Sequence, residues 1–321
     1  MATISVITAA FNKSKYISAC VESVFDQSLP PDEHIIIDDS STDTTYELVT
    51  EISKKNPKIV AIRNPKNLGY PATLNIAVRL AKSEFIAILD ADDISMDNWL
   101  LSCHEIISSN PKFGVVGGGG IIATANAIAT GKKICCDTAG DVTDLVKQGL
   151  YPILHGGALI RKSALLEIGG YNVNLKSMED NDMFLGISSI AKIFSIGKPL
   201  IYYRRLPGSE SRKSEAFLSL VKQYCTEKAF LLANGHNVLA ANQSLQPLIS
   251  KISTTDRLER TNKTTYYFEM GASFEEGKNY NKALAYYFRS LLARSEIYPS
   301  LKGVLKCILP EAIVALIKNR E

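Results

Sequence analysis

Two hydrophobic periodicities alternate along the first third of the chain. Four short apolar runs predict strands: 4–10, 34–37, 58–63 and 85–89. Three stretches between them carry apolar residues at helical spacing and predict helices: 15–27, 44–54 and 70–82. Strands that alternate with helices of this length are typical of a Rossmann-like α/β domain, whose sheet is mostly parallel and flanked by helices. A glycine-containing strand is predicted at 114–122, and residues 123–150 are expected to be irregular.

Composition limits the class of protein. The 321 residues are 46% hydrophobic, enough for one large domain or one domain with an appendage. Lys and Arg number 36 against 33 Asp and Glu, a balance that argues against a nucleic-acid partner. The six cysteines form no C-x-x-C pair, which predicts reduced thiols. Without a signal-peptide pattern or a bilayer-length apolar run, we expect a cytoplasmic protein, or one held peripherally at the inner membrane face.

The composition and hydrophobic pattern of the sequence change near residue 214, where glycines become rarer and long helical patterns begin. We therefore predict an α/β domain over 1–213 and an all-helical subdomain over 214–321. Residues 266–299 resemble one tetratricopeptide-like hairpin, which cannot bury its own apolar face alone. Residues 301–318 form an amphipathic pattern that favours docking on the chain itself, with a membrane surface as the alternative. The C-terminal helices are thus candidates for peripheral membrane or homo-oligomer contact.

Acidic clusters follow two of the predicted strands. Asp38 and Asp39 end the second strand, and "DADD" (90–93) ends the fourth. In an open parallel sheet, ligands bind beyond the carboxyl ends of the strands, so both clusters are directed to one site. Carboxylates this close repel one another, and a divalent cation relieves that repulsion. Mg²⁺ or Mn²⁺ commonly bridges a carboxylate to substrate phosphates, so the pattern predicts a metal–nucleotide-diphosphate site. Glu33 and His34 lie at the opposite end of the second strand and are expected on the surface.

Several longer stretches resemble family 2 glycosyltransferases, which have the GT-A fold. The resemblance begins with "SVITAAFNKSKY" and the residues that follow it to about residue 49. Five further blocks match in the family's order and extend to about residue 213: "NLGYPATLNIA" (67–77), "FIAILDADD" (85–93), "RKSALLEIGGYN" (161–172), "MEDNDMFLGI" (178–187) and "YYRRLPGSESRK" (202–213). This resemblance implies a GT-A catalytic domain over 1–213.

The resemblance also implies which residues bind the donor. Phe11, after Ala10, stands where the family has an aromatic residue against the nucleobase, and Asp39 matches the acid that binds the base. Asp90–Ala91–Asp92 matches the D-x-D motif, with Asp90 toward the ribose and Asp92 on the metal. Asn67 and Gly69 belong to the nucleotide-binding block. The chain departs from the family where Thr73–Leu74–Asn75 replaces the usual Ala-Arg-Asn, and Arg63, Lys66 and Arg204 are candidates to replace the missing Arg.

Asp180 matches the family's catalytic base, and Glu179 lies beside it near the acceptor. His155 falls in a stretch near the active site, where a structural role is favoured over a ligand or acceptor contact. Arg204 and Arg205 open a segment that matches a lid ordering over the donor.

The resemblance implies an inverting, metal-dependent glycosyltransferase that uses a nucleotide-sugar donor, with a UDP-sugar expected. A carboxylate must deprotonate the acceptor hydroxyl, and a single displacement inverts the anomeric centre. The acceptor is expected to be a glycan or lipid-linked glycan of a bacterial surface. Two alternatives stay open: a sugar-nucleotide nucleotidyltransferase, although "AAFNKSKY" lacks that class's Gly-rich basic loop, and a non-catalytic sugar- or partner-binding module, against which Asp92 and Asp180 together argue.

Overall fold

The computed structural model describes residues 3–175, 177–206, 215–259, 266–293 and 297–308. The chain divides into two compact units. The first unit comprises Met1–Gly120, Cys135–Ile201 and Lys213–Glu259, and the second comprises Ile121–Ile134, Tyr202–Arg212 and Arg260–Glu321. The predicted helical segment 214–321 is therefore shared between the two units rather than forming one subdomain.

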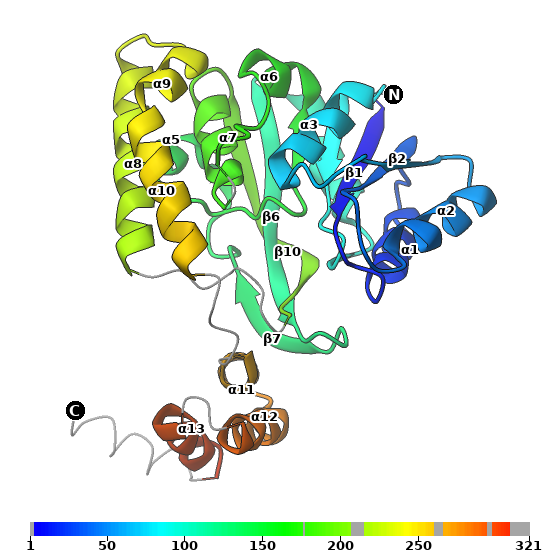
Figure 1. Ribbon diagram of the computed structural model, residues 1–321, viewed down its shortest axis with the longest axis vertical. Coiled ribbons are helices and arrows are strands. Elements are labelled where there is room, and N and C mark those ends of the chain that lie inside the picture. The colour runs from blue at the N-terminus through cyan, green and yellow to red at the C-terminus, as the bar shows by residue number, and fades with distance from the viewer. Residues whose placement is uncertain (1–2, 176, 207–214, 260–265, 294–296, 309–321) are drawn as a thin grey trace. The chain divides into compact units, whose positions relative to one another are not determined.

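Four parallel strands form one side of the sheet. They are β1 (Ile4–Ala10), β2 (Glu33–Asp38), β3 (Ile59–Arg63) and β4 (Phe85–Ile88), and their spatial order is β3-β2-β1-β4. Figure 1 labels two of them, β1 and β2. These are the four strands predicted from the apolar runs. Because Ala10 lies opposite Asp38 in the parallel register, the ends of β1 and β2 meet at one edge of the sheet.

The sheet becomes mixed beyond β4. Strand β9 (Leu159–Arg161) pairs antiparallel with β4, and β6 (Phe113–Ala123) pairs antiparallel with β9. The path continues through β10 (Lys192–Arg204) to the short β5 (Ile94–Ser95), and β8 (Gly140–Asp141) pairs antiparallel with β10. The α/β class with flanking helices is thus confirmed, with the parallel order restricted to β1–β4.

Helices cover both faces of the parallel strands. The helices of this region are α1 (Ile17–Phe25), α2 (Thr45–Lys55), α3 (Tyr70–Leu80), α4 (Trp99–Ser109), α5 (Thr143–Lys147), α6 (Lys162–Glu167) and α7 (Glu179–Ser188). Side chains of a strand alternate between its faces. Ile36 of β2 accordingly packs in a cluster with residues of α1 and α2, whereas Ile35 and Ile37 pack in the cluster that contains α3.

Two expectations about the chain before α6 were wrong. Glu33 and His34 are buried rather than on the surface. Ser5 Oγ donates to Glu33 Oε1 at 2.7 Å, and His34 Nε2 lies 2.9 Å from Thr8 Oγ1, so neighbouring strands supply polar partners for both side chains. Residues 123–150 were expected to be irregular but contain β7 (Ala129–Ile134), β8 and α5.

Three further helices belong to the first unit: α8 (Glu215–Ala233), α9 (Val238–Ser244) and α10 (Gln246–Glu259). Figure 1 shows them beside α5 and α7. Apolar side chains of α8 and α10 form a shared core with Met178 and Leu185, and Val238 of α9 belongs to the cluster that contains α3, so these helices group with the sheet. Within that layer Lys228 of α8 forms a buried ion pair with Asp182 of α7. Removing one partner of such a pair leaves an uncompensated buried charge, which typically costs about 3–5 kcal/mol.

The second unit contains a helical hairpin over the predicted 266–299 segment. Helices α11 (Tyr266–Glu276) and α12 (Tyr280–Leu292) are followed by α13 (Ile297–Ile308). A Cβ on Gly271 of α11 or Gly303 of α13 would come within 2.7 or 2.4 Å of the Tyr287 ring, so both helices approach that ring closely. Val304 is buried in the same cluster, so the described part of the predicted amphipathic helix docks on its own unit.

Some predicted features lie outside the described residues: most of the 202–213 lid segment, and residues 309–318 of the amphipathic pattern. Among the described helices, none combines the length and hydrophobicity needed to cross a membrane.

Candidate active site

The predicted base-binding acid, Asp39, organises the loop that precedes α3. Its buried carboxylate accepts hydrogen bonds from Asn64 Nδ2 at 2.7 Å, from Leu68 N at 2.9 Å and from Gly69 N at 2.9 Å. Gly69 adopts φ +87°, a conformation that favours glycine, at the residue before α3. Asp39 N donates in turn to Ala10 O at 2.7 Å. The predicted Asn67–Gly69 block is therefore tied directly to the ends of β1 and β2.

An exposed aromatic ring stands at the same edge. Phe11 directly follows β1 and is 44% exposed, unusual for a large apolar side chain beside a buried strand. Arg63 is one candidate to replace the Arg that the family usually has. In this structure it forms an ion pair with Asp38, with 3.4 Å between Nε and Asp38 Oδ2, and its Nη2 donates a hydrogen bond to Ser41 O at 2.8 Å. The ring of Phe11 is thus available for stacking, while Arg63 supports the acidic strand end.

The carboxylates of the D-x-D motif each have a partner that the sequence did not predict. Asp90 accepts a hydrogen bond from Tyr70 Oη, and Lys13 Nζ lies 2.5 Å from Asp92 Oδ2. Ala91 between them is buried. Tyr70 and Lys13 both lie within sequence blocks that resemble the family. No periodicity or spacing in the sequence indicates that Tyr70 would pair with Asp90 or Lys13 with Asp92.

The predicted base lies in the first turn of α7. Asp180 Oδ1 accepts a hydrogen bond from Asn181 N at 2.8 Å, and the helix begins at Glu179 with Met178 before it. His155 lies nearby, and its Nε2 is 2.9 Å from Tyr171 Oη. His155 is thus buried and hydrogen-bonded, as expected for a structural role.

Electrostatics link the base to the donor-binding motif. Burial raises the pKa of Asp180, opposed by His155 and by the Asn181 N–H, while the nearby Asp90 carboxylate raises it further. Burial likewise raises the pKa of Asp90, opposed by the Tyr70 hydrogen bond, with Asp92 acting in the same direction as burial. Burial lowers the pKa of His155 to about 4, so this imidazole is neutral near pH 7. Asp90 and Asp180, 90 residues apart in the sequence, thus share one site.

Asn75 fixes the backbone that carries Tyr171. Its Nδ2 donates to Tyr171 O at 2.8 Å, and its Oδ1 accepts from Tyr171 N at 2.8 Å. Gly170 has φ +77°, and a Cβ there would lie 2.4 Å from Asn75 Oδ1. Asn75 therefore holds Tyr171 where its hydroxyl reaches His155. From the sequence alone, Asn75 was noted only as the last residue of Thr73–Leu74–Asn75, which replaces the family's usual Ala-Arg-Asn.

The acidic side chains here fit a cation that substrate phosphates help to hold. Among the described residues, no group of three or more His, Cys, Asp or Glu side chains is arranged to hold a metal ion alone. Mg²⁺ is often bound by one or two carboxylates together with phosphate oxygens. Asp92 is the carboxylate predicted for that role, and in this structure it forms an ion pair with Lys13.

The first unit thus brings together Asp90, Ala91, Asp92, His155, Glu179 and Asp180, and it places Ala10, Phe11, Asp39, Asn67 and Gly69 at the neighbouring strand ends. Arg204 and Arg205 belong to the second unit. There, Arg204 is buried, and Arg205 Nη1 lies 3.3 Å from Glu269 Oε2. Their role in a lid stays a prediction.

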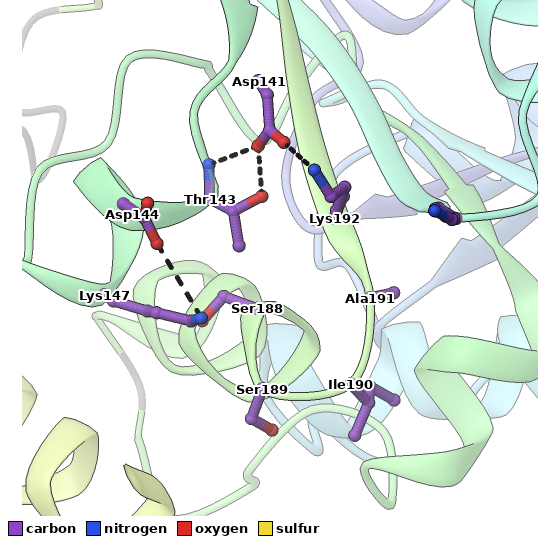
Figure 2. A pocket seen from close by; sticks show the side chains of 10 residues that line it. Asp141, Thr143, Asp144, Lys147, Ser188, Ser189, Ile190, Ala191 and Lys192 are labelled. Carbon is purple, nitrogen blue, oxygen red and sulfur yellow. Dashed lines mark hydrogen bonds and ion pairs between the residues drawn. The ribbon is translucent and has the colours of Figure 1, made fainter.

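A separate cavity of about 400 Å³ lies beside α5 and the end of α7 (Figure 2). Its charged side chains largely pair with one another: Asp141 accepts from Thr143 and from Lys192 Nζ at 2.6 Å, and Asp144 lies 3.9 Å from Lys147 Nζ. None of the predicted site residues lines this cavity, so it is distinct from the candidate active site.

Comparison with known proteins identifies the family to which this chain is related. The glycosyl transferase family 2 model matches residues 5–168, about half of the chain. A poly(ribitol-phosphate) beta-glucosyltransferase of Bacillus spizizenii is 27% identical over 67% of this chain and 34% of its own length. An Escherichia coli UDP-Glc:alpha-D-GlcNAc-diphosphoundecaprenol beta-1,3-glucosyltransferase, WfaP, is 41% identical over 29% of this chain and 36% of its own. The chain spans about a third of the length of these curated relatives.

A solved structure has a similar fold. The crystal structure of S. aureus TarS 1-349 in complex with UDP-GlcNAc superposes with a TM-score of 0.57 and 18% sequence identity. The superposition covers 94% of this chain and 90% of that one. At this identity the likeness concerns the fold, whereas the family match rests on the sequence that forms β1–β4, the D-x-D motif and α6. The chain belongs to glycosyl transferase family 2.

Proposed function

We propose that this protein is an inverting glycosyltransferase that moves a hexosyl or N-acetylhexosaminyl group from a UDP-sugar to an acceptor hydroxyl during bacterial glycan synthesis. The observation that carries the proposal is the electrostatic interaction of Asp180 with both Asp90 and His155, together with the close approach of Gly156, next to His155, to Asp90: a Cβ on Gly156 would lie 3.3 Å from Asp90 Oδ2. A base and a donor-binding motif within one site are what a direct transfer requires. The names of TarS complexed with UDP-GlcNAc and of the UDP-Glc-dependent WfaP support a UDP-sugar donor.

The nucleoside would bind at the ends of β1 and β2. Phe11 offers an exposed ring face for the base. Asp39 Oδ2 has one described hydrogen bond, from Gly69 N, and a carboxylate oxygen can accept two. Asp39 therefore keeps capacity to accept an N–H from a pyrimidine base, and Asp90 is assigned to the ribose.

Asp92 would hold Mn²⁺ or Mg²⁺ together with the diphosphate. The cation, when bound, neutralises charge that develops on the departing nucleoside diphosphate. Lys13 must then give up its contact with Asp92, and its flexible side chain is well placed to turn toward a phosphate oxygen instead. The chain itself contributes the Asp92 carboxylate, which lies in the loop directly after β4.

Asp180 is assigned as the base that removes the acceptor hydroxyl proton. A base performs best when its pKa approaches the working pH, and the raised pKa of Asp180 acts in that direction. Glu179, the residue before Asp180, is assigned to the region that contacts the acceptor. Neutral His155 is hydrogen-bonded to Tyr171 and interacts electrostatically with Asp180, so we assign it a positioning role. No second carboxylate nucleophile is required, and a single displacement inverts the anomeric carbon.

We further propose a cytoplasmic site of action, a glycan or lipid-linked glycan as acceptor, and a lid role for the segment that begins at Arg204 and Arg205. WfaP, whose name specifies a diphosphoundecaprenol-linked substrate, is the relative that favours a lipid-linked acceptor.

The test is a transfer assay with a panel of UDP-sugars, Mn²⁺ and candidate glycan acceptors. Release of UDP together with a product of inverted anomeric configuration by NMR is the expected result. Pyrophosphate release from a nucleoside triphosphate and a sugar phosphate would instead identify a nucleotidyltransferase. Binding of a sugar without turnover across the panel would favour a binding module. Asp180→Asn serves as the matched inactive control.

A further inference from the structure

A second cavity of the first unit, of about 440 Å³, lies between the loop after α6 and helices α9 and α10. Its lining is rich in carboxamides: Asn75, Asn172, Asn174, Asn242, Gln243 and Gln246. The other described lining residues are glycines, Tyr171 and the apolar Ile168, Val173 and Leu239, so none of the described side chains that face this space is charged. The volume falls within the range of small-molecule pockets.

This lining suits an uncharged, hydroxyl-rich ligand. Each carboxamide offers one acceptor and two donors, which matches the donor–acceptor character of neighbouring sugar hydroxyls. Leu239 and Val173 are 65% and 50% exposed, so apolar surface is available for the C–H face of a pyranose ring. A phosphate or carboxylate ligand is commonly bound by Lys or Arg, and neither is among the described residues that line the cavity.

The inner wall of the cavity is held in place before any ligand binds. Asn75 is fixed by its two hydrogen bonds to Tyr171, and Asn172 Oδ1 accepts from Asn174 N at 3.1 Å. Gly169 adopts φ +86°, and a Cβ at this position would lie 3.0 Å from Leu239 Cδ2. A side chain at residue 169 would therefore crowd Leu239.

Two connections link this cavity to the candidate active site. Tyr171 contributes to the cavity, while its hydroxyl lies 2.9 Å from His155 Nε2. Asn242 Oδ1 lies 3.3 Å from Tyr224 Oη, and Tyr224 donates to Asp182, two residues beyond Asp180 on α7. A ligand in the cavity would thus contact the scaffold that positions the base.

We propose that this carboxamide pocket binds an uncharged sugar unit of the acceptor glycan, apart from the unit that receives the new bond. The assignment to an acceptor rests on the proposed function, whereas the binding of a neutral sugar does not. The proposal identifies the acceptor as a chain with at least one uncharged pyranose.

The experiment compares two double variants of the full chain. Leu239→Ala/Gln243→Ala removes an exposed apolar and an exposed carboxamide side chain from the pocket. Leu218→Ala/Gln223→Ala makes the same changes at exposed positions of α8 outside it. Binding of methyl β-glucoside and of N-acetylglucosamine is measured by saturation-transfer NMR, with UDP and the diamagnetic Mg²⁺ at saturating concentration.

We expect the parent and the α8 control to bind a neutral sugar while the pocket variant loses roughly tenfold in affinity, a loss consistent with one hydrogen bond and part of an apolar contact. Glucuronate should bind more weakly than the neutral sugars. With an active acceptor, the pocket variant should raise the acceptor KM and leave kcat near the parent value.

Absence of sugar binding by the parent, or equal binding by the parent and pocket variant, would overturn the proposal. So would displacement of the sugar by UDP alone, since the sugar would then occupy the donor site. Failure of the proposed function would give a different result: the parent would neither transfer sugar nor bind UDP. The comparison of sugar binding by the parent and the pocket variant could still be made.

Discussion

Lys13 Nζ and Asp92 Oδ2 lie 2.5 Å apart, so a lysine ammonium neutralises the carboxylate that we assign to the metal. The two residues come from the loop after β1 and the loop after β4. A cation that binds Asp92 must compete with this ammonium group, because like charges repel at short range. The ion pair therefore makes metal affinity dependent on Lys13.

The first prediction concerns that competition. Lys13→Met should increase the affinity for Mn²⁺ in the absence of nucleotide, because one positive charge is removed from beside Asp92. The affinity is measurable by electron paramagnetic resonance of free Mn²⁺. Lys15→Met, an exposed lysine two residues away, is the matched control. Weaker Mn²⁺ binding by Lys13→Met than by Lys15→Met would contradict the competition.

The second prediction is that UDP binds weakly without a divalent cation. Phosphate charge placed beside Asp90 and Asp92 is repelled unless a cation lies between them. Calorimetric titration of UDP with Mn²⁺ and with EDTA tests this, and Asp92→Asn should lose most of the metal-dependent gain. Equal UDP affinity in both buffers would remove the bridging cation from the proposal.

The third prediction concerns Asp39. Its carboxylate also holds the Leu68 and Gly69 amides, so Asp39→Ala would disturb the loop as well as the donor. Asp39→Asn preserves the shape and one acceptor oxygen. We expect UDP binding to weaken by roughly 1.5–3 kcal/mol, the usual contribution of a hydrogen bond to a charged group. The melting temperature should show that the fold persists, and parent-like UDP affinity would rule out base recognition by Asp39.

The edge at which the site forms was predictable because it follows from strand order. A strand's carboxyl end is visible in the sequence, and parallel register brings Asp38 and Asp39 beside Ala10. That Asp180 interacts electrostatically with Asp90 at this edge was predictable only through the family resemblance. Nothing local indicates that α7 brings its first turn next to Asp90.

Residues that act through distant partners were missed. Tyr70 donates to Asp90, 20 positions away, and Asn75 holds Tyr171 across 96 positions. A single sequence gives no signal for such pairings. Burial of Glu33 and His34 was missed for the same reason, because Ser5 and Thr8 on the adjacent strand supply their polar partners. The sequence change near residue 214 marked a change in composition but not the packing boundary, since α8 and α10 share a core with α7.

The fourth prediction is a loss of stability in mild acid. His155 has a pKa of about 4 in the folded chain against 6.5 for an ordinary histidine. Between these values the unfolded chain binds a proton that the folded chain excludes, so stability is full above pH 6.5 and falls as pH decreases toward 4. Urea unfolding from pH 7 to pH 4.5 measures this. His155→Gln should flatten the slope, whereas His236→Gln, at an exposed position, should leave it unchanged.

His34 contributes to the same loss of folding stability as pH decreases. Burial lowers its pKa to about 3, so its protonation also opposes folding as pH falls below 6.5. His155→Gln should therefore reduce the slope without abolishing it. An unchanged slope in His155→Gln would show that the histidine is not excluded from protonation in the folded chain.

The last prediction concerns Asp180. Asp180→Asn keeps the size of the side chain and an oxygen that can accept from Asn181 N, but it cannot take a proton from the acceptor. A general base typically contributes about 10²–10⁴-fold, so transfer should fall by that factor while UDP and Mn²⁺ bind as in the parent. If Asp180 served only to stabilise the start of α7, the variant would instead melt at a lower temperature and retain transfer. Because Met178 rather than Asp180 precedes the helix, we expect little change in melting temperature. A destabilised variant with near-parent turnover would exclude Asp180 as the base.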